Sequence, residues 1–329
     1  MGSRNFYIMV CVLVFSTFLH PDLSSGADVG KIRVGVLPGV QLFPFMVMEK
    51  YDLLAKNGVE VERKAFQNPQ AVSVQLSQKA IDLGFVGWTF AMVLQARGYD
   101  VTNIYSFALN NNVVIVKKDS PIKNLSDLRG KRIGLYGGPA GLSTATLKII
   151  CKKYYNLDLE RDAKVHYGSP IAQVGLFENG DLDAVLSLDP IATRTISKGN
   201  CRVIARIDKE WEKFRKHPAL LVSMVSNREF IDANENSVKG FIRAFKESIG
   251  ILDQNDAIWK DLAGAVRITD PKTVAALRES LHGVYTAAWN PSVIAEIKTV
   301  AEEGYKLLGK KFLPVSWNDK AFDLRFGSE

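Results

Sequence analysis

Short apolar runs alternate along the chain with stretches whose apolar residues recur at helical spacing. Residues 32–37 form the first apolar run, and residues 81–86 form another. Between them, Val72, Leu76 and Ala80 lie four residues apart, which places them on one face of a helix. This alternation predicts an α/β fold of mainly parallel sheets with helices on both faces.

The alternation continues as far as residue 225. We predict strands at residues 32–37, 59–62, 81–86, 100–107, 113–116, 132–135, 163–167, 184–188, 202–207 and 220–225. We predict helices at residues 69–80, 88–97, 124–128, 142–154, 171–179 and 190–197. The second half of this region resembles the first in pattern, though not in residues.

Beyond residue 225 the apolar positions repeat only at helical spacing. Asp270-Pro271 and Asn290-Pro291 each place a capping side chain before a proline at the first helical position, as Asn68-Pro69 does earlier. A helical tail without strands of its own must pack on an existing sheet. We expect it to return to the first of two lobes.

A polar break at residues 117–121 separates the two α/β regions. We expect two lobes joined by two crossings of the chain, near residues 110–117 and 215–225. In open α/β sheets ligands bind in the crevice at the carboxyl ends of the strands, so the space between the lobes is the expected site. The predicted boundaries are residues 28–112 and 220–329 for lobe 1, and residues 113–219 for lobe 2.

The first 27 residues have the pattern of a cleaved signal peptide. Arg4 provides a basic start, residues 6–19 form an apolar stretch of 14 residues, and Ser25-Gly26-Ala27 offers a cleavage site. A membrane anchor needs about 20 apolar residues, so a retained anchor is the weaker alternative. The segment at 1–27 therefore predicts export across the inner membrane to the periplasm.

Composition and charge narrow the function only slightly. The hydrophobic fraction of 47% and the charged fraction of 23% are ordinary for a globular protein. The formal charge of +7 is spread along the chain rather than concentrated in a stripe, so we expect no nucleic-acid partner. Cys151 and Cys201 are interpreted as buried free thiols, although an exported protein also allows a disulfide between them.

The turn before the predicted helix at 142–154 is the best candidate for binding an anion. Gly138 and Gly141 let the backbone approach a ligand, and the helix that follows offers unpaired N–H groups. Ser143 and Thr144 add hydroxyl donors. The alternative is an ordinary strand-to-helix turn with capping hydroxyls.

Other candidates follow strand ends or lie at the first crossing. Aromatic side chains there could form a wall for a ligand, or could simply pack in the core. Amide and carboxylate side chains could bond a ligand, or could cap a turn or a helix. These candidate ligand-binding residues are Gln41, Leu42, Phe43, Trp88, Thr89, Asn111 (from the run Asn110-Asn111-Asn112) and Asp189.

Several stretches in a fixed order carry a family resemblance: residues 31–36, 49–61, 75–84, 119–134, 178–184 and 189–190. Together they resemble the nitrate/sulfonate/taurine-type solute-binding proteins of ABC importers. The resemblance covers residues 31–253. It implies a type II periplasmic-binding-protein clamshell that closes on a small solute and delivers it to a membrane permease and its ATPase. It also implies a monomer without a cofactor.

Two departures from the family pattern bear on the ligand. Tyr51 stands where the family has a glycine, and the loop at residues 39–45 is unusually apolar and aromatic. Both favour an organic ligand over a simple anion such as nitrate. A sulfonate, taurine-like or related organic acid is the leading expectation, and a pyrimidine precursor of thiamine or another aromatic compound is the alternative.

The sequence offers little support for catalysis. His166, His217 and His282 lie far apart, without the spacing of a metal site, and no Gly-x-Ser-x-Gly elbow appears. Enzymes of thiamine and menaquinone biosynthesis share the family fold, but the Cys-rich segment of the thiamine-pyrimidine type is absent. We therefore expect a binding protein and not an enzyme. An enzyme on the same scaffold, or a ligand-sensing module for a membrane signalling partner, remains open.

Overall fold

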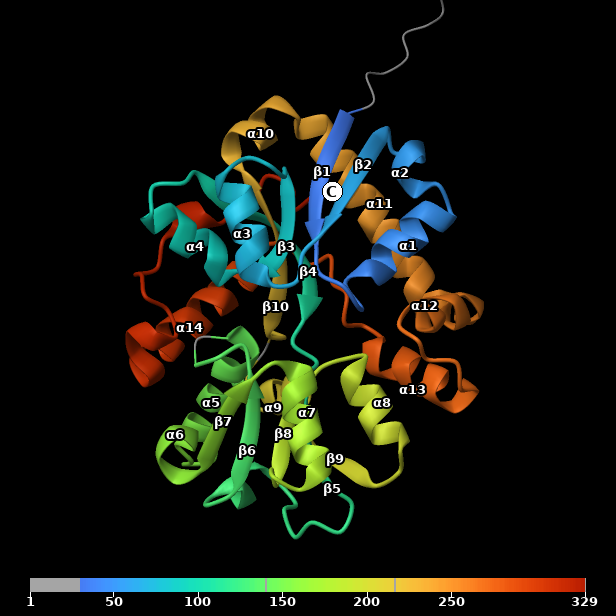
Figure 1. Cartoon of the computed structure of the whole chain (residues 1–329). Helices are drawn as coiled ribbons and strands as arrows, with labels where there is room; N and C mark the ends of the chain where they lie inside the picture. The colour runs from blue at the N-terminus through green and yellow to red at the C-terminus, as the bar shows by residue number, and fades with distance from the viewer. Residues whose placement is uncertain (1–29, 140, 216, 329) are drawn as a thin grey trace, which may run out of the picture.

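The computed structural model describes residues 30–139, 141–215 and 217–328. The predicted signal peptide at residues 1–27 lies outside the described residues. The chain forms two α/β lobes, each built around a five-stranded sheet, arranged one above the other (Figure 1). The α/β class and the two-lobed architecture predicted from the sequence are confirmed.

The sheet of the first lobe has the strand order β2-β1-β3-β10-β4. Strands β1, β2 and β3 are parallel, whereas β10 is antiparallel to both of its neighbours. The strands are β1 (Gly30–Val36), β2 (Val59–Ala65), β3 (Leu83–Gly87), β4 (Val101–Leu109) and β10 (Leu220–Asn227). Its helices are α1 (Leu42–Lys50), α2 (Leu53–Lys56), α3 (Pro69–Ser77), α4 (Thr89–Ala96), α10 (Arg228–Ala233) and α11 (Glu235–Gln254).

The sheet of the second lobe has the order β7-β6-β8-β5-β9, and here β5 is the antiparallel strand. Both sheets are therefore mainly parallel, as predicted. The strands are β5 (Val113–Lys117), β6 (Arg132–Tyr136), β7 (Lys164–Gly168), β8 (Ala184–Ser187) and β9 (Cys201–Arg206). The helices are η1 (Leu125–Leu128), α5 (Leu142–Tyr154), α6 (Leu159–Asp162), α7 (Pro170–Asn179), α8 (Ile191–Ser197) and α9 (Ile207–Glu212).

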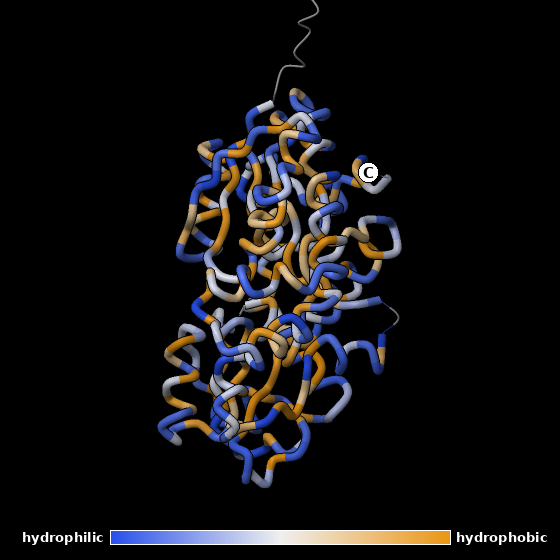
Figure 2. Tube along the Cα trace, turned by 90° about the vertical axis from the view of Figure 1, so that its right-hand side faces the viewer, coloured by the Kyte–Doolittle hydropathy of each residue, from blue (hydrophilic) through white to orange (hydrophobic). Residues whose placement is uncertain are grey.

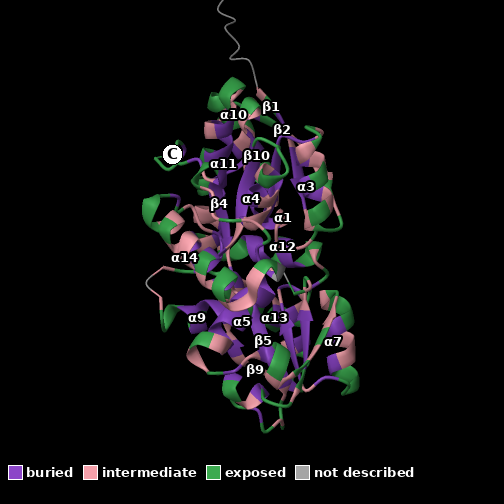
Figure 3. Ribbon diagram, turned by 90° about the vertical axis from the view of Figure 1, so that its left-hand side faces the viewer, coloured by how far each residue is buried: buried purple, intermediate pink, exposed green. Residues whose placement is uncertain are grey.

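Each lobe has helices on both faces of its sheet and a buried interior. In the first lobe, α3 and α4 cover one face through Val72 and Leu94, while α1 and α11 cover the other through Phe45 and Phe241. Figure 3 shows the sheets as buried in both lobes, with exposed residues on the outer helices. Hydrophobic segments likewise run through both lobes in Figure 2. One face of each sheet has a separate small cluster, whereas the largest hydrophobic cluster continues from the first lobe into the second.

The helix starts predicted from Asx-Pro pairs are confirmed by their hydrogen bonds. The Asn68 side chain accepts from the Ala71 N–H at 2.9 Å, and the Asp270 side chain accepts from the Thr273 N–H at 2.9 Å. Asn290 accepts from two N–H groups of the next helix. These contacts satisfy helix N–H groups that have no partner within the helix.

The helical tail, which was expected to return to the first lobe, contacts both lobes. Its helices are η2 (Asp256–Ile258), α12 (Trp259–Ala265), α13 (Pro271–Leu281), α14 (Pro291–Leu308), η3 (Gly309–Lys311) and η4 (Asp319–Ala321). The tail does not return to the first lobe alone, because α13 packs against α8 and α14 packs against α5, both in the second lobe (Figure 1). Polar residues on the tail, which the apolar stripes did not take into account, pair with second-lobe residues such as Lys153.

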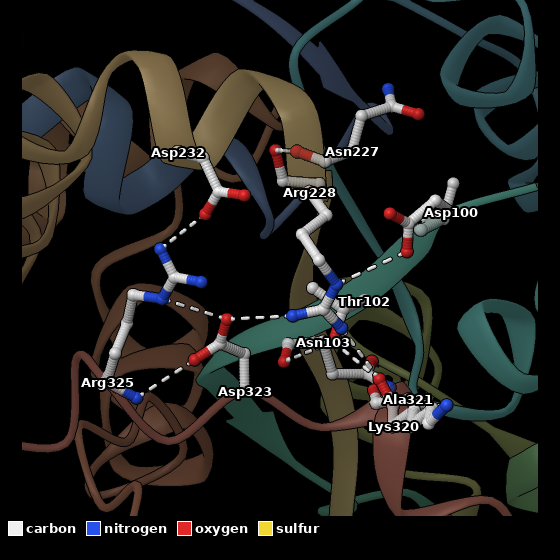
Figure 4. A network of polar contacts seen from close by, with 12 residues as sticks. Asp100, Thr102, Asn103, Asn227, Arg228, Asp232, Lys320, Ala321, Asp323 and Arg325 are labelled. Carbon is white, nitrogen blue, oxygen red and sulfur yellow. Dashed lines mark hydrogen bonds and ion pairs between the residues drawn. The ribbon is translucent and has the colours of Figure 1, made fainter.

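The tail is nevertheless anchored on the first lobe along the free edge of β4. Tyr285 forms a bridge with Ala108, and Phe322 forms another with Asn103. Around the second bridge, Asp323 accepts from Arg228 and from Arg325 in the network of Figure 4. The tail thereby covers an edge strand that would otherwise expose unpaired backbone groups.

Both cysteines of the described chain, Cys151 and Cys201, are free and buried, as expected. Burial raises the pKa of the Cys151 thiol well above its ordinary value. In the described part of the chain, no helix combines the length and the apolar character needed to span a bilayer.

Candidate functional site

The carboxyl edges of the two sheets face one another where the chain crosses between the lobes. Strand β4 ends at Leu109, and β5 begins at Val113 opposite Ser187, the last residue of β8. Four extended residues span at most about 14 Å, so these two edges lie close together. We call this region, with its strand ends and the loops that follow them, the interlobe junction.

The lobes touch at the junction. A Cβ built on Gly87, at the end of β3, would lie 3.6 Å from Leu142 Cδ2 at the start of α5. A Cβ built on Gly39, in the loop after β1, would lie 3.8 Å from Pro190 Cδ in the second lobe. A Cβ at either position would be in ordinary van der Waals contact with the other lobe, so the two lobes are close together here.

A chain of buried polar side chains crosses the junction. Asn112 Nδ2 donates to Asn110 Oδ1 at 2.8 Å and to Ser143 Oγ at 2.6 Å. Asn110 is only 1% exposed, and its Nδ2 has no partner among the described residues. Asn110 Oδ1 accepts from Asn112, and a buried donor is left unpaired at Asn110 Nδ2.

A second unpaired group lies at the end of β8. Ser187 is fully buried, and its Oγ has no hydrogen-bond partner in the described structure. An unpaired buried polar group costs about 1–3 kcal/mol, so native structures contain few of them. Asn110 and Ser187 therefore mark the junction as a place where a polar guest would supply missing hydrogen bonds.

The glycine turn before α5 has a backbone that only glycine accommodates. Gly138 has a φ of 68°, and a Cβ on Gly141 would lie 2.8 Å from the Gly137 carbonyl oxygen. The first turn of α5 receives no side-chain cap from Gly141. Thr144 Oγ1 donates to the Tyr136 carbonyl at 2.6 Å. This bond favours the alternative in which the hydroxyl stabilises an ordinary strand-to-helix turn.

The aromatic candidates lie in the core of the first lobe. Phe43 is fully buried and packs edge-on against Trp259. Trp88 is 1% exposed, and its Nε1 donates to the Leu220 carbonyl at 3.2 Å. These contacts favour the packing alternative for both rings. Leu42 and Thr89 beside them are half-buried.

Two amide candidates hold the backbone of the junction. Gln41 Oε1 accepts from the Leu37 N–H at 3.1 Å, which fixes the loop after β1. Asn111 Nδ2 donates to the Ser280 carbonyl at 3.2 Å, which joins the first crossing to α13. Their side chains are therefore engaged with the protein.

Asp189 shows the capping role and also a contact that the sequence did not indicate. Its Oδ1 accepts from the N–H and the hydroxyl of Thr193 at 3.1 Å and 2.6 Å, at the start of α8. Its Oδ2 accepts from Ser280 Oγ of α13. Nearby, Tyr285 donates to the Val40 carbonyl at 2.5 Å, and burial together with the Asp189 charge raises the pKa of Tyr285.

The sequence missed part of this arrangement. Ser187 could have been found from its place at a strand end, and Asn110 belongs to the asparagine run from which Asn111 was selected. Ser280 and Tyr285 gave no signal, because the tail was expected to contact the first lobe only. No group of three or more potential metal ligands occurs among the described residues.

Two surface cavities lie outside this polar cluster. One, of about 390 Å³, lies between the second crossing and the start of α14, and is lined by His217, Pro218 and Pro291, among others. A wider one, of about 700 Å³, lies beside the Arg228 network of Figure 4. Neither includes Asn110, Ser187 or Asp189 in its lining.

Comparison with known proteins places the chain in a family. The family described as NMT1/THI5 like matches residues 40–255 of the chain. A curated relative, 4-amino-5-hydroxymethyl-2-methylpyrimidine phosphate synthase of Schizosaccharomyces pombe, is 25% identical over 211 residues. That match covers 61% of this chain and 59% of the relative, so the chain spans about three fifths of the relative's length.

Solved structures share the fold at lower identity. The periplasmic aliphatic sulphonate binding protein SsuA of Escherichia coli is 20% identical with a TM-score of 0.72, covering 87% of this chain and 94% of that one. The alkanesulfonate-binding protein SsuA of Xanthomonas axonopodis pv. citri, bound to MOPS, is 21% identical with a TM-score of 0.69, covering 88% and 99%. These similarities establish the two-lobed periplasmic-binding-protein fold.

Proposed function

The chain belongs to the NMT1/THI5-like family, and from this premise we propose that it is the solute-binding component of an ABC importer. A small organic solute would be held at the interlobe junction. The observation that carries this proposal is the pair of buried, unpaired polar atoms there, Asn110 Nδ2 and Ser187 Oγ. A guest with hydrogen-bond acceptors would satisfy both and remove their desolvation cost.

We propose a sulfonate, a taurine-like compound or a related organic acid as the solute. The uncapped N-terminus of α5 offers N–H donors and the positive end of a helix dipole. Two proteins of the same fold are named as sulfonate-binding proteins, which supports the same class of solute. A pyrimidine or other aromatic solute is the alternative within the binding role.

The remaining parts of the proposal concern location and partners. We propose that residues 1–27 direct export to the periplasm and are cleaved, and that the mature protein is a monomer. Lobe 1 would comprise residues 28–112 and 220–329, and lobe 2 residues 113–219. Closure at the two crossings would present the solute to a permease and its ATPase.

An enzymatic function is the second candidate, because the curated relative from Schizosaccharomyces pombe is named as a synthase. The two functions differ in one observable. An enzyme releases a new compound from a candidate substrate, whereas a binding protein returns its solute unchanged. Mass spectrometry of the small molecules after incubation with purified protein separates the two outcomes.

A thermal-shift screen of residues 28–329 tests the proposal. Sulfonates, amino acids, carboxylates and pyrimidines form the panel, and a binder at about 100 times its Kd adds about 2.7 kcal/mol of stability. We expect a sulfonate or organic acid to raise the Tm. A panel in which no compound shifts the Tm would contradict the proposal.

Two serine-to-alanine variants test the position of the binding site in the same thermal-shift assay. Ser187→Ala removes an unpaired hydroxyl, so the Tm without solute should not fall while the solute-induced shift should shrink. The matched control is Ser226→Ala, since Ser226 is equally buried but donates to the Asp82 carbonyl at 2.7 Å. It should lower the Tm without solute and leave the shift unchanged.

A further inference from the structure

The tail contacts the second lobe at two places, which differ in the polar contacts made there. At the first, α14 packs on α5, and Glu303 pairs with Lys153 and Arg215. Arg215 also pairs with Glu296 at 2.9 Å, and Lys152 donates to the Leu307 carbonyl at 3.2 Å. Arg215 belongs to the second crossing, so this contact lies at the hinge.

At the second place α13 packs on α8, and two polar contacts join this part of the tail to the second lobe. Ser280 Oγ donates to Asp189, and Arg194 donates to the Val266 carbonyl at a long 3.4 Å. Only the first of these is a short side-chain bond. The α13–α8 side is therefore joined by fewer polar bonds than the α14–α5 side, although the two helix pairs pack to a similar extent.

The end of α13 is held firmly to the first lobe. The Leu109 N–H donates to the Val284 carbonyl at 2.9 Å, and the Thr286 N–H donates to the Phe107 carbonyl at 3.0 Å. Within the tail, Arg278 of α13 pairs with Asp256 of η2 at 2.5 Å. The bond between Ser280 and Asp189 consequently joins the two lobes across the junction.

We propose that Ser280 and Asp189 form a latch that holds the lobes closed over the solute. The proposal deepens the solute-binding function above and rests on it. Asp189 is 8% exposed and receives two bonds from Thr193, so the carboxylate is fixed in position before Ser280 reaches it. Closing the lobes then completes its hydrogen bonds, and opening removes one of them.

A latch and a direct contact with the solute affect binding affinity in different ways. It changes the fraction of closed protein, and the apparent affinity for every solute scales with that fraction. Removal of the Ser280 hydroxyl should therefore weaken binding of different solutes by the same factor, up to about ten-fold for one bond to a charged group. A residue that touches the solute would change affinities by different factors.

The first test measures lobe separation without any solute. Spin labels are placed at Gln70→Cys and Ala172→Cys, two exposed positions in the first turns of α3 and α7. These helices follow the carboxyl ends of β2 and β7, so each label lies on the junction side of its lobe. Both native thiols are buried and remain unlabelled. Pulsed electron paramagnetic resonance then gives the distance distribution.

We expect Ser280→Ala to lower the ratio of short to long distances about ten-fold, and Ser280→Thr, which keeps the hydroxyl, to preserve it. Glu303→Gln at the hinge contact should leave the distribution near that of the parent protein. Equal distributions for Ser280→Ala and the parent, or a parent with no short-distance population, would overturn the latch. Circular dichroism confirms that each variant is folded.

The second test uses taurine and methanesulfonate as probes in calorimetric titrations. Ser280→Ala should weaken both by one common factor, and factors that differ several-fold would contradict the latch. If neither probe binds the parent protein, the sulfonate proposal fails. The label distances still decide the latch in that case, so the two failures are distinguishable.

Discussion

In the first lobe, Arg33 of β1 donates to Asp82 through its backbone N–H, Nε and Nη2, at 2.7, 3.0 and 2.6 Å. In the second lobe, Arg132 of β6 makes the same three contacts with Asp183, at 2.8, 3.2 and 2.7 Å. Each aspartate returns its own N–H to the arginine carbonyl, and each lies directly before a central strand. The two lobes therefore repeat one frame in residues as well as in pattern.

The two frames differ in burial. The side chain of Asp82 is 8% exposed, whereas that of Asp183 is 31% exposed. The core beside the first frame is aromatic, since Phe85 packs against Phe45 and Phe107. At the equivalent position, three residues after its aspartate, the second lobe has Leu186. We therefore expect the same sequence feature to contribute more to stability in the first lobe, where the aspartate is more deeply buried.

The largest expected effect comes from truncating the aromatic core. Phe85→Ala should lower the free energy of unfolding by about 4 kcal/mol, because a fully buried ring is lost and a cavity remains. The matched change Leu186→Ala should cost about 3 kcal/mol. Urea unfolding of both variants measures the difference. A larger loss for Leu186→Ala would contradict the proposed difference between the lobes.

A smaller effect is expected at the buried aspartate. Asp82→Asn removes a carboxylate charge that accepts three hydrogen bonds from Arg33, at a cost of about 2–3 kcal/mol. The same unfolding measurement checks it. A change below about 1 kcal/mol would show that burial does not strengthen this pair.

The corresponding change in the second lobe should be milder. Asp183→Asn should cost about 1 kcal/mol, because solvent screens the more exposed pair with Arg132. The ratio of the two losses in free energy of unfolding, measured in the same buffer, tests this comparison most directly. Equal losses at Asp82 and Asp183 would contradict it.

The smallest effect is a dependence on pH. Hydrogen bonding to Arg132 lowers the pKa of Asp183 below its ordinary value near 4. The stabilisation from this carboxylate is therefore complete above about pH 4 and is lost as the pH falls through its lowered pKa. Unfolding free energies between pH 5 and about pH 2.5 should fall less steeply for Asp183→Asn than for the parent protein; identical slopes would refute the assignment.

Much of the fold could be predicted from local patterns. All ten predicted strands occur within two or three residues of their predicted ends, and the helix at 142–154 matches α5. Period-two and helical spacing, with Asx-Pro caps, depend on neighbouring residues only. The recurrence of the Arg-Asp pair was missed, because its partners lie 49 and 51 residues apart in sequence and only the sheet brings them together.

The candidate site was harder to predict because it depends on contacts between distant segments. The glycine turn and the asparagine run could be identified from residue type and position. The partners of Asp189 could not, since Ser280 lies 91 residues away in sequence, on a helix that was not expected to contact the second lobe. Burial of Trp88 likewise depends on Phe312, which comes from the end of the tail.

The most direct test of the solute-binding account is a crystal structure of residues 28–329 with the strongest binder from the thermal-shift screen. The account predicts the compound between the lobes, with an acceptor atom within hydrogen-bond distance of Asn110 Nδ2 or Ser187 Oγ. A compound bound elsewhere, or one at the junction that contacts neither atom, would contradict it.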